Sequence, residues 1–233
     1  MDGEQSIHSQ LLEKVRDYRM PPAARDLLNA HLPLVIVGIT ASGKSSVTDY
    51  IKQTSDYRQV ITHTTRQPRP GEVHGQHYYF ISDEDMIKMM ADEALVEVQT
   101  IHSHEVYGIS LSAYQTVLKG GYKPLLIIDV QGVEEISQYV PKLRPVFLLP
   151  ASFDEWMRML EKRGRMSHAE RLRRMHSAHA ELEKVLEKEK FFFVTNRDVP
   201  STARDILGDV HDHASQRRGR ETAQLLIDRL KTT

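Results

Sequence analysis

The chain has 233 residues, which is enough for one α/β domain with a substantial core and small insertions. Its 31 lysine and arginine residues are balanced by 32 aspartate and glutamate residues, so no excess of positive charge indicates nucleic-acid binding. It has no cysteine, which excludes disulfides and thiolate metal sites. The first ten residues lack the pattern of a signal peptide and no apolar run is long enough to span a bilayer, so we expect a cytoplasmic protein without a membrane partner.

Helices and strands are predicted to alternate along the chain. Residues 1–31 are expected to form a helical lead-in, with one helix at about 5–19 and a short one within 20–31, before a single domain that spans 32–233. Further helices are predicted at about 44–54, 82–92, 112–121, 132–140, 152–164, 167–190, 201–217 and 221–230, and strands at 32–38, 58–63, 94–102, 123–130, 144–150 and 191–196. The charge run ELEKVLEKEK is predicted to be an exposed helix. The alternation favours an α/β fold, with helices flanking a parallel sheet.

The segment GITASGKSS, residues 38–46, follows the first apolar strand and precedes a helix. It fits the pattern G-x-x-x-x-G-K-[ST], in which two glycines let the backbone fold around an anion and direct N–H groups at it. The lysine can reach the outer phosphates of a nucleoside triphosphate, and the hydroxyl that follows can bind Mg²⁺. We therefore predict a phosphate loop with Lys44 as a catalytic residue and Ser45 as the metal ligand. The expected binding residues are Gly38, Ile39, Thr40, Ala41, Ser42, Gly43, Lys44, Ser45 and Ser46.

The segment THTTRQPRPGEVHGQHYYF, which follows the strand predicted at 58–63, concentrates cationic and hydroxyl side chains. Arg66 and Arg69 lie three residues apart in a stretch stiffened by prolines, and their planar forks of donors suit a dianionic phosphate. The Tyr78 hydroxyl can add a further donor. The simpler alternative for two arginines alone is a solvated basic loop.

Four segments, in this order, resemble the guanylate kinase family: HTTRQPRPGEVHGQHYYF, LLIIDVQGVEEI, LEKRGRMSHAERLRRM and FVTNRD. The resemblance runs from about residue 32 to 215. It implies the fold of a P-loop nucleoside monophosphate kinase, with an insertion at about 64–97 that binds the monophosphate and a lid at about 160–170. It also implies ATP and Mg²⁺ as cofactors and GMP as the small-molecule substrate. The sequence leaves open whether the protein is a monomer or homodimer. The use of dGMP stays open.

The resemblance also implies roles for individual side chains. Glu97 matches the glutamate that accepts hydrogen bonds from the N1–H and the amine of guanine, a donor pair that adenine lacks. The implied substrate-binding residues are Thr62, Arg66, Arg69, Tyr78, Glu97, Tyr107 and Asp129. Lys44, Arg66, Arg163 and Arg174 are the implied catalytic residues, and Asn196 is placed near the adenine of ATP.

Three apolar residues depart from the pattern of the family. Ile109 stands where the family has a serine or threonine, with Ser110 adjacent, and Ile127 replaces the first aspartate of a D-x-D segment. Met159 replaces the first lid arginine. Because each change removes a polar group, a second hypothesis is a kinase of another small phosphorylated acceptor. A third is a guanylate-kinase-like binding module with weak or no catalysis, against which the intact phosphate loop argues.

Overall fold

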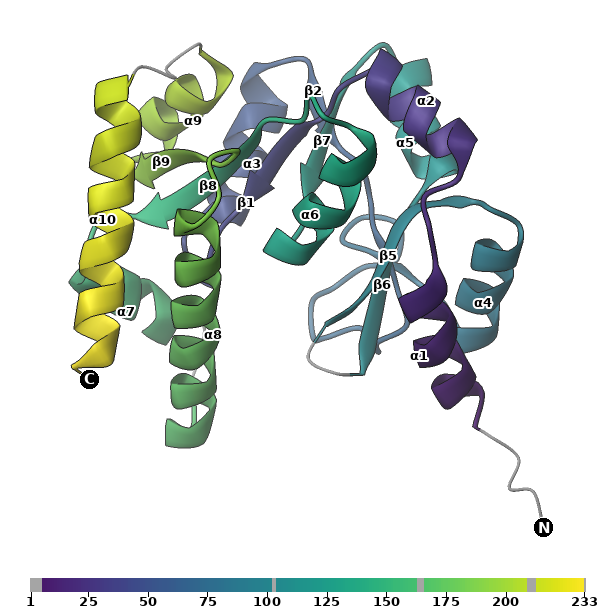
Figure 1. Cartoon of the computed structure of the whole chain (residues 1–233), viewed down its shortest axis with the longest axis horizontal. Helices are drawn as coiled ribbons and strands as arrows, with labels where there is room; N and C mark the ends of the chain where they lie inside the picture. Colours follow the sequence, from purple (N-terminus) through teal and green to yellow (C-terminus); the bar gives the residue numbers. More distant parts are fainter. Residues whose placement is uncertain (1–5, 102–103, 163–165, 209–212, 233) are drawn as a thin grey trace. The chain divides into compact units, whose positions relative to one another are not determined.

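The computed structural model describes residues 6–101, 104–162, 166–208 and 213–232. These residues form two compact units (Figure 1). Unit 1 comprises Met1–Pro33, Arg58–Pro124 and Glu134–Leu143. Unit 2 comprises Leu34–Tyr57, Leu125–Val133 and Arg144–Thr233.

A five-stranded sheet, most of which belongs to unit 2, has the strand order β2-β7-β1-β8-β9. The strands are β1 (Leu34–Val37), β2 (Tyr57–Gln59), β7 (Lys123–Ile127), β8 (Pro145–Pro150) and β9 (Phe192–Asn196). β1 pairs in parallel with β7 and β8, and β8 pairs in parallel with β9. Their apolar sequences suit burial on both faces, and this confirms the expected parallel sheet flanked by helices.

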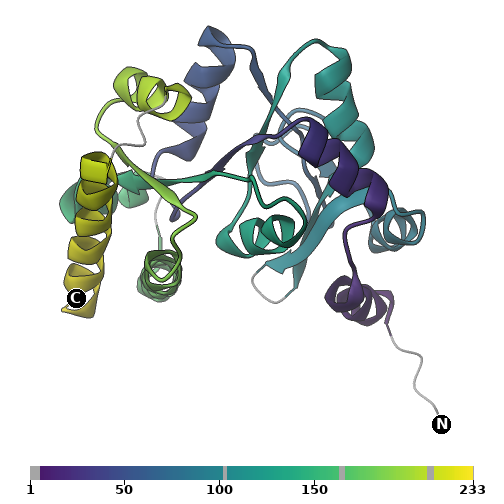
Figure 2. The ribbon, with the colours of Figure 1, turned by 45° about the horizontal axis from the view of Figure 1, so that its top comes forward.

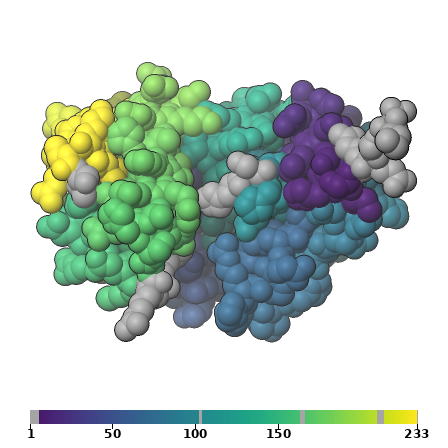
Figure 3. All heavy atoms as spheres, turned by 90° about the horizontal axis from the view of Figure 1, so that it is seen from below, coloured from purple at the N-terminus to yellow at the C-terminus, as the bar shows by residue number. Residues whose placement is uncertain are grey.

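Helices cover the sheet of unit 2. They are α3 (Lys44–Thr54), α7 (Phe153–Glu161), α8 (His168–Leu186), α9 (Val199–Leu207) and α10 (His213–Lys231), and α6 (Val130–Tyr139) begins in the same unit. Figure 2 shows α9 beside α3, where both close over a core that includes Ile36, Val47 and Ile206. In the space-filling view, α8 (green) and α10 (yellow) lie side by side (Figure 3).

The C-terminal helices differ from the prediction. We expected a break near residues 218–220, but α10 continues through Gly219. A Cβ atom at this position would overlap with the side chain of Phe193 on β9, so glycine is needed here for close packing rather than for a turn. The Gln216 side chain adds a hydrogen bond, because its Oε1 accepts from the backbone nitrogen of Phe193 at 2.8 Å.

Unit 1 contains a second sheet of four strands in the order β4-β3-β6-β5. The strands are β3 (His63–Thr64), β4 (Tyr79–Phe80), β5 (Leu95–Ile101) and β6 (Glu105–Ser110). β6 pairs antiparallel with both β3 and β5. The sequence did not predict β6, and the strand predicted at 58–63 is in fact divided between β2 and β3, which belong to different sheets.

Four helices of unit 1 pack around this sheet: α1 (Ile7–Asp17), α2 (Pro22–Ala30), α4 (Asp83–Ala91) and α5 (Leu111–Lys119). One face of the β5–β6 hairpin is apolar, and its Val98 and Val106 pack with Leu11 of α1 and Met86 of α4. The Tyr18 hydroxyl donates to the carbonyl of Leu95 at 2.7 Å, which ties the lead-in to the start of β5. Within the described ranges, no helix is both long and apolar enough to cross a membrane.

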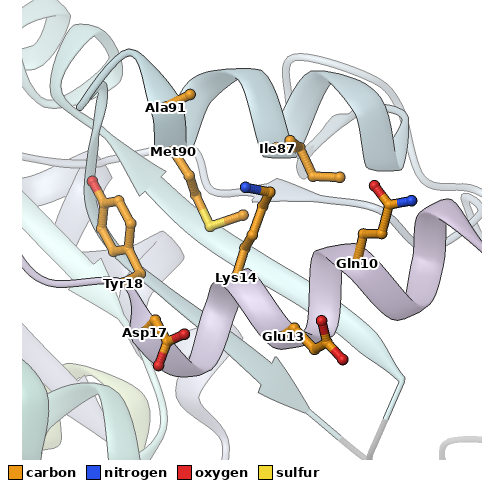
Figure 4. Close-up of a pocket in the computed structure, with 8 residues that line it drawn as sticks. All are labelled: Gln10, Glu13, Lys14, Asp17, Tyr18, Ile87, Met90 and Ala91. Atoms are coloured by element: carbon orange, nitrogen blue, oxygen red, sulfur yellow. The ribbon is translucent and has the colours of Figure 1, made fainter. Parts of the chain in front are cut away.

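A pocket of about 460 Å³ lies between α1 and α4 (Figure 4). It is lined by Gln10, Glu13, Lys14, Asp17, Tyr18, Ile87, Met90 and Ala91. Burial raises the pKa of Tyr18 to about 12, so this hydroxyl keeps its proton at neutral pH and acts as a structural donor to β5.

Candidate active site

The phosphate loop of unit 2 joins β1 to α3 and requires glycine at two positions. Gly38 has φ +150° and Gly43 has φ +92°, both in the region that disfavours side chains. A Cβ atom at Gly38 would overlap with the carbonyl oxygen of Leu148, and one at Gly43 would overlap with the amide of Asn196. The curled backbone that the sequence pattern predicted is therefore present, and neighbouring atoms leave no room for a side chain at either glycine.

Two side chains of unit 2 fix the loop by hydrogen bonds to its carbonyl oxygens. Asn196, at the end of β9, donates from Nδ2 to the oxygen of Ser42 at 2.9 Å. Trp156, which is fully buried on α7, donates from Nε1 to the oxygen of Thr40 at 2.8 Å. Asn196 thus lies against the phosphate loop, and its place near the adenine of ATP stays a prediction. No local pattern in the sequence indicated the anchoring role of Trp156.

Lys44 folds back onto its own loop. Its ammonium group donates to the carbonyl oxygens of Gly38 and Ile39. Ser45 and Ser46 occupy the first turn of α3 and are exposed, so their backbone N–H groups lie at the positive end of the helix dipole. Ile39, Ala41 and Ser42 are buried, while Thr40 is partly exposed.

Two carboxyl groups of unit 2 have pKa values that burial raises. Asp129 accepts a hydrogen bond from the backbone nitrogen of Gly132 at 2.8 Å, and burial raises the pKa of its carboxyl group. Burial also raises the pKa of Glu181 on α8 to about 7, although the charge of Lys44 works in the opposite direction. Glu181 lies in the charge run that we predicted to be an exposed helix, so the sequence did not predict that this side chain is buried.

Of the two predicted lid arginines, Arg174 lies in the part of the chain that the structure describes. Arg174 on α8 donates from Nε to Oε1 of Glu170 at 2.8 Å, and Arg173 reaches the other oxygen of the same carboxylate. Hydrogen bonds from Arg173 and Arg174 lower the pKa of Glu170 to about 2. Arg163 and the middle of the expected lid at 160–170 lie outside the described residues.

Unit 1 presents a polar sheet face on the side opposite to its apolar core. Side chains alternate along a strand, so Glu97 and Gln99 point away from the face of Val98. In the register of the hairpin, Gln99 lies opposite Tyr107 and Glu97 lies opposite Ile109. We use the name polar sheet face for Glu97, Gln99 and Tyr107 together with the neighbouring Arg66 and Glu72. The Glu97 side chain is 6% exposed.

Arg66 is the central cation of the polar sheet face and is 8% exposed. It donates from Nε to the Tyr107 hydroxyl at 2.8 Å and from Nη1 to the oxygen of Gln67 at 2.9 Å. Nη1 and Nη2 also donate to the two oxygens of Glu72 at 2.6 and 2.7 Å. These hydrogen bonds lower the pKa of Glu72 to about 2. Four of the five N–H donors of the guanidinium thus have partners within the described part of the chain.

The other predicted phosphate-binding side chains lie around Arg66. The ring of Tyr78 lies 4.9 Å from Cζ of Arg66. Arg69 has a side chain that is 63% exposed, and its Nη2 is 3.9 Å from Oε1 of Glu105. The Tyr107 hydroxyl donates to the other oxygen of Glu105 at 2.9 Å. The structure therefore gathers the predicted arginines and tyrosines and adds two carboxylates that the sequence analysis did not single out.

The remaining substrate-binding predictions fall in two places. Thr62 immediately precedes β3 in unit 1, and its carbonyl oxygen accepts from the backbone nitrogen of Tyr79 at 2.9 Å. Asp129 belongs to unit 2, with the phosphate loop. No group of three acidic or histidine side chains that could hold a metal ion by itself occurs among the residues that the structure describes.

Comparison with known proteins agrees with this geometry. The family model described as guanylate kinase matches residues 30–212. A guanylate kinase of Leifsonia xyli subsp. xyli is 37% identical over 177 residues, covering 75% of this chain and 68% of that protein. A guanylate kinase of Streptomyces coelicolor is 36% identical over 189 residues, and the alignment covers 81% of this chain and 92% of that protein.

A solved structure gives the same result for the fold. The guanylate kinase of Anaplasma phagocytophilum superposes with a TM-score of 0.57 at 19% identity, covering 79% of this chain and 86% of that one. The matched region contains both the phosphate loop and the polar sheet face. The chain belongs to the guanylate kinase family.

Proposed function

We propose that this chain is an ATP-dependent guanylate kinase, which converts GMP and MgATP into GDP and ADP. The observation that carries the proposal is the polar sheet face of unit 1, where a buried carboxylate and an arginine–tyrosine cluster lie on the same side of one sheet. The guanylate kinase family model matches the chain across this sheet. No observation favours either of the alternatives, another phosphorylated acceptor or a non-catalytic binding module.

Recognition of the base falls to Glu97 in this proposal. An ionised carboxylate presents two acceptor oxygens, and guanine presents two adjacent donors, the N1–H and the 2-amino group. Adenine has an acceptor at N1 instead, so it would leave the carboxylate facing a lone pair. Burial makes that mismatch costly, because water cannot compensate the carboxylate.

Recognition of the acceptor phosphate falls to the arginines and tyrosines of unit 1. Arg69 is the more accessible guanidinium and is placed to bind the phosphate first. Arg66 has most of its donors on Glu72, Gln67 and Tyr107, so it provides a positive potential in a fixed orientation. Tyr78 and Tyr107 complete the proposed phosphate site.

The phosphate loop fits a triphosphate by the chemistry of its donors. Its glycines leave no room for side chains, its backbone N–H groups precede a helix, and Lys44 supplies a mobile cation. When triphosphate binds, we expect the ammonium group to leave the carbonyl oxygens of Gly38 and Ile39 and to contact phosphate oxygens. The lysine then stabilises the charge that develops as the γ-phosphorus leaves the bridging oxygen of ADP and bonds to a phosphate oxygen of GMP.

The residues present also fit Mg²⁺ in the way that nucleotide kinases use it. Mg²⁺ takes few protein ligands and several phosphate oxygens and waters, which agrees with an exposed Ser45 and no three-residue metal cluster within the described ranges. Bound there, Mg²⁺ would neutralise phosphate charge. Ser45 would ligate it.

The moving parts follow from the same proposal. We expect the insertion at 64–97 and the lid at 160–170 to close over bound nucleotides and exclude water. Arg174 would then exchange its partner Glu170 for the transferring phosphoryl group, together with Arg163. We also propose that the protein works in the cytoplasm as a monomer or homodimer.

A coupled assay of ADP release tests the proposal. The purified full chain is given MgATP and, in turn, GMP, dGMP, AMP, CMP or UMP. We expect turnover with GMP to exceed that with AMP, CMP and UMP by at least tenfold in kcat/KM. If another phosphorylated compound is preferred, the second hypothesis replaces this one, and if nothing is turned over while nucleotide still binds, the chain is a binding module.

A further inference from the structure

Gln99 is a buried side chain whose hydrogen-bonding groups are unused. It is 3% exposed, and neither Oε1 nor Nε2 has a hydrogen-bond partner among the residues that the structure describes. A buried primary amide without partners costs folding free energy, because it has given up its hydrogen bonds to water. Such a group points to a ligand that supplies the missing partners.

Gln99 lies among the side chains of the polar sheet face. It lies two residues beyond Glu97 on β5, so both side chains project from the same face of the sheet. It is directly opposite Tyr107, whose hydroxyl accepts a hydrogen bond from Arg66. Gln99 therefore lies within the polar sheet face, next to the carboxylate that we propose to bind guanine.

Two positions on β6 do not supply a further polar group to this face. Ile109, opposite Glu97, is fully buried and cannot hydrogen-bond a base. The hydroxyl of Ser110 accepts from the backbone nitrogen of Ala113 at 3.0 Å and thereby caps α5. Ser110 also lies on the opposite face from Tyr107, since it is an odd number of residues away along the strand.

We propose that Gln99 is a further specificity-determining residue, whose Nε2 amide donates a hydrogen bond to O6 of guanine. This inference rests on the proposed function. While Glu97 accepts from N1–H and the 2-amino group, the neighbouring O6 requires a donor, and Gln99 provides one from the next position on the same face. The polar group that Ile109 lacks is thus supplied from the adjacent strand.

Analogues that change one edge of the base separate the two side chains. In 6-thio-GMP, sulfur, a weak acceptor, replaces O6, while N1–H and the 2-amino group stay. IMP keeps O6 and N1–H but lacks the 2-amino group. The kcat/KM of each analogue relative to GMP is measured with MgATP for the wild type and for Gln99→Met, which keeps the volume but removes the amide. Gln115→Met, at an exposed site on α5, is the matched control.

We expect the wild type to prefer GMP over 6-thio-GMP by about tenfold, which corresponds to ~1.4 kcal/mol. In Gln99→Met this preference falls to about one, by the same hydrogen-bond argument. The preference for GMP over IMP stays at the wild-type value, because Glu97 is intact. The melting temperature of the free variant does not fall, because the amide has no partner there to lose. The control variant matches the wild type in both ratios.

Two results overturn the inference alone. One is a GMP to 6-thio-GMP preference that survives in Gln99→Met, and the other is a lower melting temperature with both ratios lost, which is the signature of a structural glutamine. If Gln99→Met is insoluble, the preferences for GMP over 6-thio-GMP and over IMP are measured with Gln99→Leu instead. Failure of the proposed function is distinct, because the wild type itself would then not phosphorylate GMP, and the inference would fall with it.

Discussion

The phosphate loop of unit 2 and the polar sheet face of unit 1 hold their cations in different ways. In the loop, the Lys44 ammonium contacts neutral carbonyl oxygens, those of Gly38 and Ile39. On the sheet face, the guanidinium of Arg66 contacts a carboxylate, that of Glu72, through two donors. Both sets of hydrogen bonds have a charged donor, but only Arg66 also has a charged acceptor, so an ion pair adds to its hydrogen bonds.

The difference in how the two cations are held suggests a separate role for each region. We propose that a triphosphate displaces these carbonyl oxygens when it binds Lys44, and that the ammonium group then follows the charge of the transferring group. Arg66 is held in one orientation by Glu72 and Tyr107, and keeps that orientation before any acceptor arrives. We therefore propose that the loop serves phosphoryl transfer and the polar sheet face serves substrate selection, and the following variants test that division.

The largest effect is expected from Lys44→Ala. Removing a cation that stabilises the developing phosphate charge should lower kcat by about 10²- to 10³-fold. Lys52→Ala, on the same helix and paired only at the surface with Asp49, is the control and should retain activity. Circular dichroism and the melting temperature establish that both variants are folded. An unchanged kcat in Lys44→Ala would remove the loop from the mechanism.

The next largest effect is expected from Glu97→Ala. The variant leaves the N1–H and 2-amino donors of guanine unpaired in a buried site, which costs about 2–3 kcal/mol, or about 30- to 150-fold in kcat/KM for GMP. AMP makes no such pair and should be affected far less. Steady-state kinetics with both acceptors give the result, and equal losses for GMP and AMP would assign Glu97 a structural role.

A smaller effect is expected from Glu72→Gln. It leaves the buried Arg66 without its anion, which should cost about 2 kcal/mol of the free energy of unfolding and lower the melting temperature by about 4–8 °C. GMP, whose phosphate carries negative charge, should then raise the melting temperature more in the variant than in the wild type. A smaller shift with GMP in the variant would mean that Glu72 prepares Arg66 rather than merely holding it.

The contribution of Glu72 also predicts a pH dependence. Its pKa is lowered to about 2 from the usual 4.5, chiefly by the hydrogen bonds from Arg66. The stabilisation is therefore complete above pH 4.5 and is lost as the pH falls toward 2. In this window the wild type should lose more stability than Glu72→Gln, as denaturant titrations at several pH values would show.

The smallest effect concerns Glu181, beside the loop. Burial raises its pKa to about 7 from 4.5, so between these values the folded protein keeps a proton that the unfolded chain has released. Stability therefore falls as the pH rises through this window. Glu181→Gln should remove the fall and make the variant more stable than the wild type at pH 8, but not at pH 4, in denaturant titrations. If the two proteins differed in stability by the same amount at both pH values, the titration of Glu181 would not be the cause.

Features that depend on a few consecutive residues could be predicted from the sequence. The phosphate loop needs only its glycines, its lysine and the helix that follows. The caps of α4 and α7 are equally local, because the hydroxyls of Ser82 and Ser152 accept from backbone nitrogens three residues later. The parallel sheet followed from the alternation of apolar strands and helices.

Features that depend on tertiary contacts could not be predicted. β6 contains a glycine and few consecutive apolar residues, and it becomes a strand because it pairs with β3 and β5. Gly219 is helical because α10 packs closely against Phe193. The contact of Glu72 with Arg66 depends on the fold of a long loop, and the position of Gln99 opposite Tyr107 depends on the register of the second sheet. The raised pKa of Glu181 depends on burial within a charge run. No single-residue pattern carries that information.

The division between transfer and selection is tested most directly by one ratio, kcat/KM for GMP divided by kcat/KM for AMP. It is measured in the wild type, in Lys44→Ala and in Glu97→Ala under the same conditions. The account predicts that Lys44→Ala lowers both constants and leaves the ratio unchanged, while Glu97→Ala lowers the ratio by about 30-fold or more. A ratio that changes equally in both variants, or in neither, would contradict it.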